Sequence, residues 1–116
     1  DMTIKKNLVA GSTTMLILTL LSEKEMYGYQ MIETLFTRSD HTFALKAGTL
    51  YPLLHNMEMQ GLLTSYEAPA GAARIRKYYR ITTKGRGALA EKKAEWHTYT
   101  AAVNQVLEGG ANHAAF

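Results

Sequence analysis

The segment Arg74–Arg80 carries the side chains with the clearest chemistry in this sequence. It reads RIRKYYR, so four cations and two tyrosines fall within seven residues. Lysine and arginine bind phosphate groups by charge, and aromatic rings beside them suit an element that lies along a nucleic-acid backbone. The candidate DNA contacts in this segment are Arg74, Arg76 and Lys77.

The positive charge of the whole chain is concentrated around that segment. Of the 13 lysines and arginines, eight fall in residues 74–93, where Glu91 is the one acidic residue. A cluster of a single sign is expected of a surface that binds a polyanion. A solvated basic face, or a sheet edge protected from aggregation by its charges, is the alternative explanation. Four cations in seven positions are harder to explain in that way.

A second set of candidate contacts lies on a helix that we predict over residues 47–60. The helix buries one apolar stripe at the spacing i, i+3, i+4, i+7, which consists of Leu50, Leu53, Leu54 and Met57. The opposite face presents Thr49, Tyr51 and His55, which reach phosphates or base edges if the helix start enters a major groove. This face has no Arg or Gln, so we expect weak base readout, with affinity from phosphates and DNA shape. Packing of Tyr51 against the preceding helix is an equal alternative.

The residues that enzymes and metal sites require do not form a recognisable set. The four histidines are scattered without an i, i+4 pair, and the chain has no cysteine. No serine lies in a nucleophile-elbow context. We therefore expect no enzyme activity, no metal and no cofactor. The most apolar run, Met15–Leu21, is far below the roughly 18–20 residues that span a bilayer, so a cytoplasmic protein without a membrane segment is expected.

The predicted elements place the basic segment on a β-hairpin beside a group of helices. Helices are expected at about Lys5–Ser22, Tyr27–Thr37 and Ala47–Gln60, with Gly61 as the positive-φ stop of the third. Strands are expected at Leu62–Glu67 and Ile75–Ile81, and a short strand at His41–Leu45 is expected to pair with them. The predicted core also includes the residues Ile32, Leu35, Phe36, Ile75, Tyr79 and Ile81. The fold class is mostly α with a small β-hairpin wing, a winged helix-turn-helix.

A long last helix is predicted to start at a Thr82-Thr83 cap and to end at Glu108, before Gly109-Gly110. Apolar residues recur along it with coiled-coil spacing, at Leu89, Trp96, Val103, Tyr99 and Val106. We expect this seam to be the interface of a two-fold homodimer; packing on the chain's own first helix is the alternative. We therefore expect a single compact domain with a winged helix-turn-helix DNA-binding region (1–82), a C-terminal dimerisation helix (83–108) and a flexible tail (109–116).

Trp96 is also a candidate for binding a small molecule. A lone Trp on such a seam is usually a core or interface residue. Across a dimer axis, however, two facing indoles leave a flat apolar slot that suits a planar aromatic or cationic effector. The candidate effector site consists of Trp96, Tyr99, Ser12 and Leu16.

Several short motifs together resemble the PadR family of bacterial transcriptional regulators, over about residues 8–107. The motifs are Tyr27-Gly28-Tyr29, GTLYPLL at 48–54, Gly61-Leu-Leu63, RKYY at 76–79, Ile81-Thr82, Gly85 and Trp96. The single C-terminal helix resembles the short branch of the family, which includes multidrug-responsive repressors whose paired Trp residues hold planar drugs.

The resemblance implies a dimeric repressor that binds a palindromic operator in double-stranded DNA and is released by a small molecule. Thr49 and Tyr51 match the recognition-helix motif of the family, Arg76 and Lys77 its wing motif, and Trp96 the Trp of its drug-binding members. The chain departs from the family pattern at the helix cap, at one usually basic position and at the wing tip, namely at Lys46, Asn56 and AGAAR (70–74). The alternative function is a dimerisation or protein-interaction module without its own operator.

Overall fold

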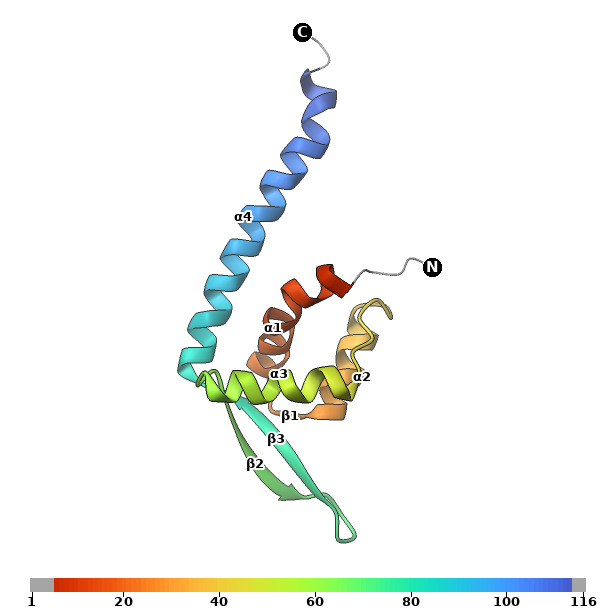
Figure 1. Ribbon diagram of the computed structural model, residues 1–116, viewed down its shortest axis with the longest axis vertical. Coiled ribbons are helices and arrows are strands. Elements are labelled where there is room, and N and C mark those ends of the chain that lie inside the picture. The colour runs from red at the N-terminus through yellow and green to blue at the C-terminus, as the bar shows by residue number, and fades with distance from the viewer. Residues whose placement is uncertain (1–5, 114–116) are drawn as a thin grey trace.

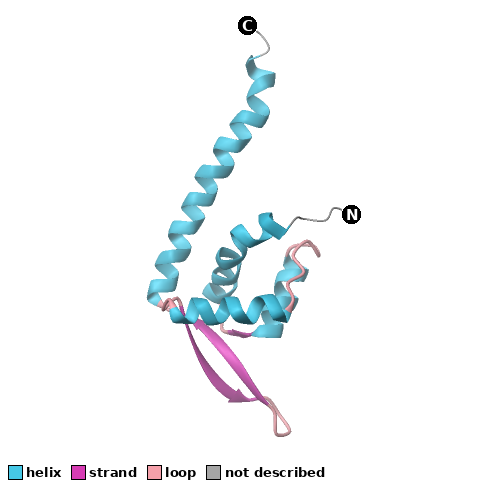
Figure 2. Cartoon of the chain, viewed as in Figure 1, coloured by secondary structure: helices cyan, strands magenta, loops and turns pink. Residues whose placement is uncertain are grey.

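The computed structural model describes residues 6–113, and the side chains of residues 12–109. Its elements, in chain order, are α1 (Lys6–Glu23), β1 (Met26–Tyr27), α2 (Gly28–Arg38), α3 (Ala47–Met59), β2 (Leu63–Pro69), β3 (Ile75–Ile81) and α4 (Thr83–His113). Helices α1, α2 and α3 form a compact body, from which the β2–β3 hairpin projects in one direction and α4 in another (Figures 1 and 2). This is the predicted winged helix-turn-helix with a long C-terminal helix. Lys5 and residues 114–116, at the ends of the predicted first helix and tail, lie outside the described residues.

The core forms where the three body helices meet the base of the hairpin. Leu50, Leu54 and Met57 of α3 are at most 1% exposed, so three of the four residues in the predicted stripe are fully buried, and Leu53 is half-buried. They pack with buried side chains of α1 and α2, of which the largest are Ile17, Leu18, Leu20 and Met31. Helix α3 begins at Ala47 after an extended Lys46, and Gly61 follows it with φ 78°, as the sequence predicted.

The sheet has three antiparallel strands in the order β1-β3-β2. In the hairpin, Leu63 pairs with Ile81 and Pro69 with Ile75, and the turn between them has left-handed backbone at Gly71 and Ala73. Tyr79 and Ile81 are buried, as predicted. Ile75 is 67% exposed, so its predicted place in the core is wrong. The reason is its position at the outer end of the hairpin, which extends beyond the helical body (Figure 1).

The predicted strand at His41–Leu45 is also wrong, because those residues form a turn and an irregular connection. The third strand is β1 instead, in which Met26 pairs with Tyr79 and Tyr27 with Tyr78. Left-handed backbone at Asp40 (φ 53°) and His41 (φ 67°) turns the chain back over the end of α2. Phe36, predicted as core, is 37% exposed, because its ring stacks on His41 at the surface with the centroids 4.4 Å apart.

The start of α4 is held by three successive backbone carbonyls of the turn between α3 and β2. The Gln60 carbonyl accepts a hydrogen bond from Lys84 Nζ (2.8 Å) and the Gly61 carbonyl accepts one from Thr82 Oγ1 (2.6 Å). The Leu62 carbonyl accepts one from the Thr82 N–H (3.1 Å). Thr82 Oγ1 in turn accepts the Gly85 N–H (2.9 Å), which confirms the predicted cap.

The far end of α4 differs from the prediction. The helix continues through Gly109-Gly110 to His113, so the predicted end at Glu108 is wrong, and residues 109–113 of the predicted tail are helical. A glycine inside a helix costs only about 1 kcal/mol relative to alanine and does not have to stop it. Within residues 6–113, no helix combines the length and the hydropathy of a membrane span.

Candidate nucleic-acid interface

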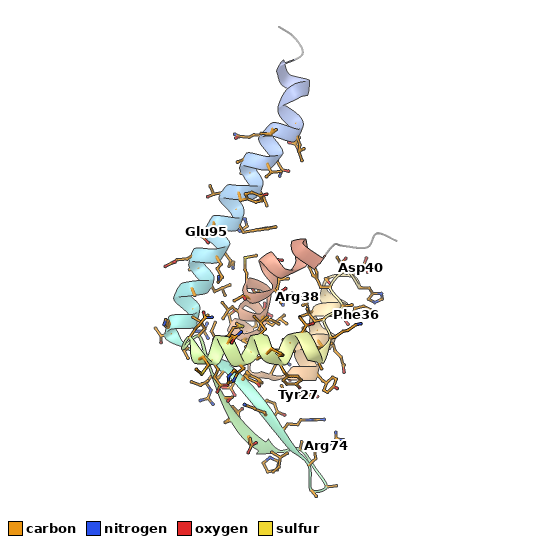
Figure 3. All side chains as sticks on the ribbon, in the orientation of Figure 1. Tyr27, Phe36, Arg38, Asp40, Arg74 and Glu95 are labelled. Atoms are coloured by element: carbon orange, nitrogen blue, oxygen red, sulfur yellow. The ribbon has the colours of Figure 1, made fainter. Side chains whose placement is uncertain are left out.

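A groove of about 490 Å³ lies between the start of α2, one side chain of α3 and the outer end of the hairpin. Its lining residues are Tyr27, Gly28, Tyr29, Glu33, Tyr51, Arg74, Ile75, Arg76 and Lys77. In the view of Figure 3, Tyr27 lies beneath α3 and Arg74 near the outer end of the hairpin. Four of the six predicted DNA contacts therefore meet in one place. The other two, Thr49 and His55, are exposed on α3 but do not line the groove.

Tyr51 packs on α2, which is one of the two alternatives for its role, and it also lines the groove. A Cβ atom on Gly28 would lie 2.2 Å from Tyr51 Oη, which shows that the phenol rests directly on the glycine at the start of α2. The side chain remains 39% exposed. Burial raises the pKa of Tyr51, and Tyr29 raises it further, so the hydroxyl stays protonated and able to donate a hydrogen bond.

Arg76 is oriented by aromatic rings on the outer face of the sheet. Side chains alternate along a strand, so Arg76, Tyr78 and Arg80 of β3 share one face. The Arg76 guanidinium carbon lies 4.3 Å from the centre of the Tyr27 ring, and Tyr27 meets Tyr78 edge-on at 5.5 Å. A guanidinium above a ring keeps its N–H groups free at its edge, so Arg76 can still bind a phosphate.

Lys77 lies on the inner face of the sheet, where it pairs with a carboxylate of α3 that also accepts a hydrogen bond from β2. Its Nζ is 4.0 Å from Glu58 Oε1, while Glu58 Oε2 accepts a hydrogen bond from Ser65 Oγ at 2.6 Å. The Lys77 side chain is half exposed. An exposed ion pair contributes only about 0–1 kcal/mol, so Lys77 can exchange this carboxylate for a phosphate.

Sequence reasoning missed the contribution of the start of α2 to this groove. Tyr27, Gly28 and Tyr29 form a motif of the family resemblance for which the sequence predicted no DNA contact, yet all three line the groove. Their signal was a glycine between two tyrosines at a helix start, where a missing Cβ permits close packing. Glu33 also lines the groove one turn later, and it is the one acidic residue among the nine lining residues.

The predicted effector and interface residues lie along α4 and on the helix beside it. Trp96 is 45% exposed and Tyr99 64%, with ring centroids 6.4 Å apart. Val106 is 80% exposed and Val103 half-buried, whereas Leu89 is 7% exposed and belongs to the core of the chain itself. On α1, which packs against α4, Ser12 is buried and Leu16 is half-buried. In the part of the chain that the structure describes, no three His, Asp or Glu side chains come together as a metal site.

Comparison with known proteins gives one consistent family. Residues 17–91 match the model of the transcriptional regulator PadR-like family. A transcriptional regulator of Mycobacterium tuberculosis is 36% identical over 99 residues, which are 85% of each chain. A solved PadR family transcriptional regulator from Eggerthella lenta is 40% identical, with a TM-score of 0.76 over 88% of this chain and 87% of that one. A solved transcriptional regulator from Clostridium thermocellum is 29% identical, with a TM-score of 0.79 over 86% and 97% of the two chains. The chain belongs to the PadR-like family of transcriptional regulators.

Proposed function

We propose that this regulator is a homodimeric repressor, which binds a palindromic operator in double-stranded DNA and is released by a small planar aromatic effector. The observation that carries the DNA-binding part is the groove, where Tyr51 of α3 meets Arg74, Arg76 and Lys77 of the hairpin. A recognition helix beside a cationic hairpin is the arrangement with which winged helices hold a duplex. The hairpin is called the wing below.

Phosphate contacts supply most of the affinity in this proposal. The cations of the groove belong to the wing, and the exposed face of α3 offers only hydroxyl, imidazole and amide groups, at Thr49, Tyr51, His55 and Asn56. None of these gives the bidentate arginine contact that distinguishes guanine most strongly. Recognition of the operator therefore relies largely on the shape and deformability of the duplex.

The apolar side chains that α4 leaves exposed support the homodimer. The helix has 31 residues, so it is roughly 46 Å long at about 1.5 Å per residue. Beyond its packing on α1 it presents large exposed side chains, namely Trp96, Tyr99, Val106 and Leu107. A second copy of the same helix covers them in a two-fold arrangement, and this arrangement places two recognition helices on the two halves of a palindrome.

A selection from random duplexes tests the DNA-binding part of the proposal. The purified protein is mixed with a random duplex pool at low salt, and the retained DNA is sequenced. We expect enrichment of a palindrome with half-sites about one helical turn apart. Retention of DNA without enrichment of any sequence would show that the protein binds DNA non-specifically through its positive charge. No retention at low salt would favour the alternative function, a dimerisation or protein-interaction module without an operator.

The effector part predicts that a planar cationic dye such as proflavine quenches the protein's tryptophan fluorescence. Trp96 is the sole tryptophan of the sequence, so the signal reports that position alone. The Trp96→Ala variant has no such signal, so its binding is measured by calorimetry, and we expect the binding to be lost. His97→Ala, an exposed neighbour, is the matched control and should bind as the wild type does. Undiminished dye binding by Trp96→Ala would place the effector site elsewhere, and sedimentation shows whether that variant is still dimeric.

A further inference from the structure

Glu25 connects the helical body to both strands of the wing. It lies between the end of α1 and β1, and its two carboxylate oxygens accept hydrogen bonds from two different strands. Tyr66 Oη of β2 donates to Oε1 at 2.5 Å, and Arg80 Nε of β3 donates to Oε2 at 2.7 Å. Both donors thus hold the carboxylate in its charged form, and the pKa of Glu25 is lowered, first by the Tyr66 hydrogen bond and then by that of Arg80.

A continuous set of ring contacts leads from Glu25 to the groove. The Arg80 guanidinium lies over the Tyr66 ring at 5.0 Å, and Tyr66 stacks on Tyr78 with centroids 5.6 Å apart and planes at 15°. Tyr78 meets Tyr27 edge-on, and Tyr27 carries Arg76 above its ring. A change in the tilt of β2 and β3 at Glu25 therefore changes where Arg76 stands in the groove.

We infer that Glu25 is a positioning residue for DNA binding: it fixes the angle of the wing on the helical body by holding Tyr66 and Arg80 together. This inference rests on the proposed function. Glu25 itself does not line the groove and makes no DNA contact in this role. It also binds Arg80, which leaves Arg74, Arg76 and Lys77 as the wing cations that face the phosphates.

Because Glu25 is negatively charged, the inference can be tested by whether removal of that charge weakens or strengthens DNA binding. A carboxylate near a polyanion-binding surface repels phosphates, so its removal must strengthen DNA binding if charge alone matters. A positioning role predicts the reverse, since the wing cations lose their fixed places. The two explanations therefore give opposite results for the same substitution.

The test measures operator affinity and salt dependence for three variants of the full chain. Glu25→Gln should bind the selected operator about fivefold more weakly, because an exposed ion pair contributes little per subunit but both subunits of the dimer lose it. Tyr66→Phe removes one hydroxyl and no charge, and should also weaken binding, by about twofold. Glu67→Gln is the matched control: Glu67 is an exposed wing carboxylate with no ion pair among the described residues, and its removal should leave binding equal or stronger.

Hydrogen exchange without DNA gives a readout that does not depend on the operator. In Glu25→Gln and Tyr66→Phe, the backbone amides of Tyr78 and Tyr79, the two β3 residues that lie opposite β1, should exchange faster than in the wild type, at an unchanged Tm. Equal or tighter DNA binding by Glu25→Gln would overturn the inference, as would unchanged exchange. If the wild type selects no operator, the proposed function fails, and the exchange data still decide whether Glu25 positions the wing.

Discussion

Replacing Gly85 with alanine is expected to lower the free energy of unfolding by about 2–3 kcal/mol, one of the larger effects available to a single methyl group in this chain. A Cβ atom at Gly85 would lie 2.2 Å from the Leu62 carbonyl oxygen and 2.8 Å from Ile81 Cγ1. The carbonyl belongs to the backbone and also accepts the Thr82 N–H, so it cannot move without loosening the junction between α4 and the turn after α3. The helix start must therefore separate from the turn that precedes β2.

Gly87→Ala is the matched control for this prediction, two residues further along the same helix. A Cβ atom there meets nothing within 4 Å, so alanine should stabilise the chain by up to about 1 kcal/mol through its helix propensity. Urea unfolding at one fixed protein concentration measures both variants, because the stability of the proposed dimer would depend on concentration. Equal stability of the two variants would contradict the close approach of α4 to the Leu62 carbonyl in the turn before β2.

The long elements could be predicted from the sequence because each carries its own periodic signal. The stripe of α3 and the alternation of β3 are local patterns, and Gly61 and Thr82 mark ends that the structure confirms. The strand β1 could not be found in this way. It has two residues, Met26 and Tyr27, and is a strand only through its pairing with Tyr79 and Tyr78, more than fifty positions away.

The errors at exposed apolar residues have a common cause. Phe36 and Ile75 have the spacing of core residues, but neither reaches the core. Phe36 stacks on His41 at the surface, and Ile75 lies at the outer end of the hairpin. Periodicity predicts which side of an element is apolar, and tertiary structure decides how far along the element that side is covered. The length of α4 is a similar case, since Gly109-Gly110 looked like a stop and only weakens the helix.

Most of the groove could be predicted as a list of residues, but its assembly could not. The cations of RIRKYYR and the position of Tyr51 were visible in the sequence. The contact between Tyr51 and Gly28 joins two helices across an irregular connection, and no pattern in either helix requires it. The hydrogen bonds of Glu25 to Tyr66 and Arg80 could not be predicted either, because these partners lie 41 and 55 residues from Glu25 in the sequence.

Replacing Arg74 and Arg76 together with alanine is expected to flatten the salt dependence of operator binding by about 3.6 units in a plot of log K against log salt. Each phosphate contact contributes about 0.9 to that slope, and the proposed dimer would lose two contacts in each subunit. Arg74 is exposed at the wing turn, and Arg76 stands over Tyr27 in the same groove, so neither is needed for the core. Binding isotherms at several salt concentrations measure the slope.

The double substitution Lys92→Ala/Lys93→Ala is the control that distinguishes direct phosphate contacts in the groove from general electrostatic attraction of DNA. It removes the same net charge from α4, about two and a half turns beyond the start of that helix. Charges that lie further from the bound DNA than the Debye length of roughly 8–10 Å are largely screened. This control should therefore change the slope of log K against log salt by less than about one unit. Equal flattening by both pairs would mean that only the overall positive charge attracts DNA and that the groove is not the contact. A large change from the arginines alone would place phosphates in the groove, because only there do the wing cations lie beside Tyr51 of the recognition helix.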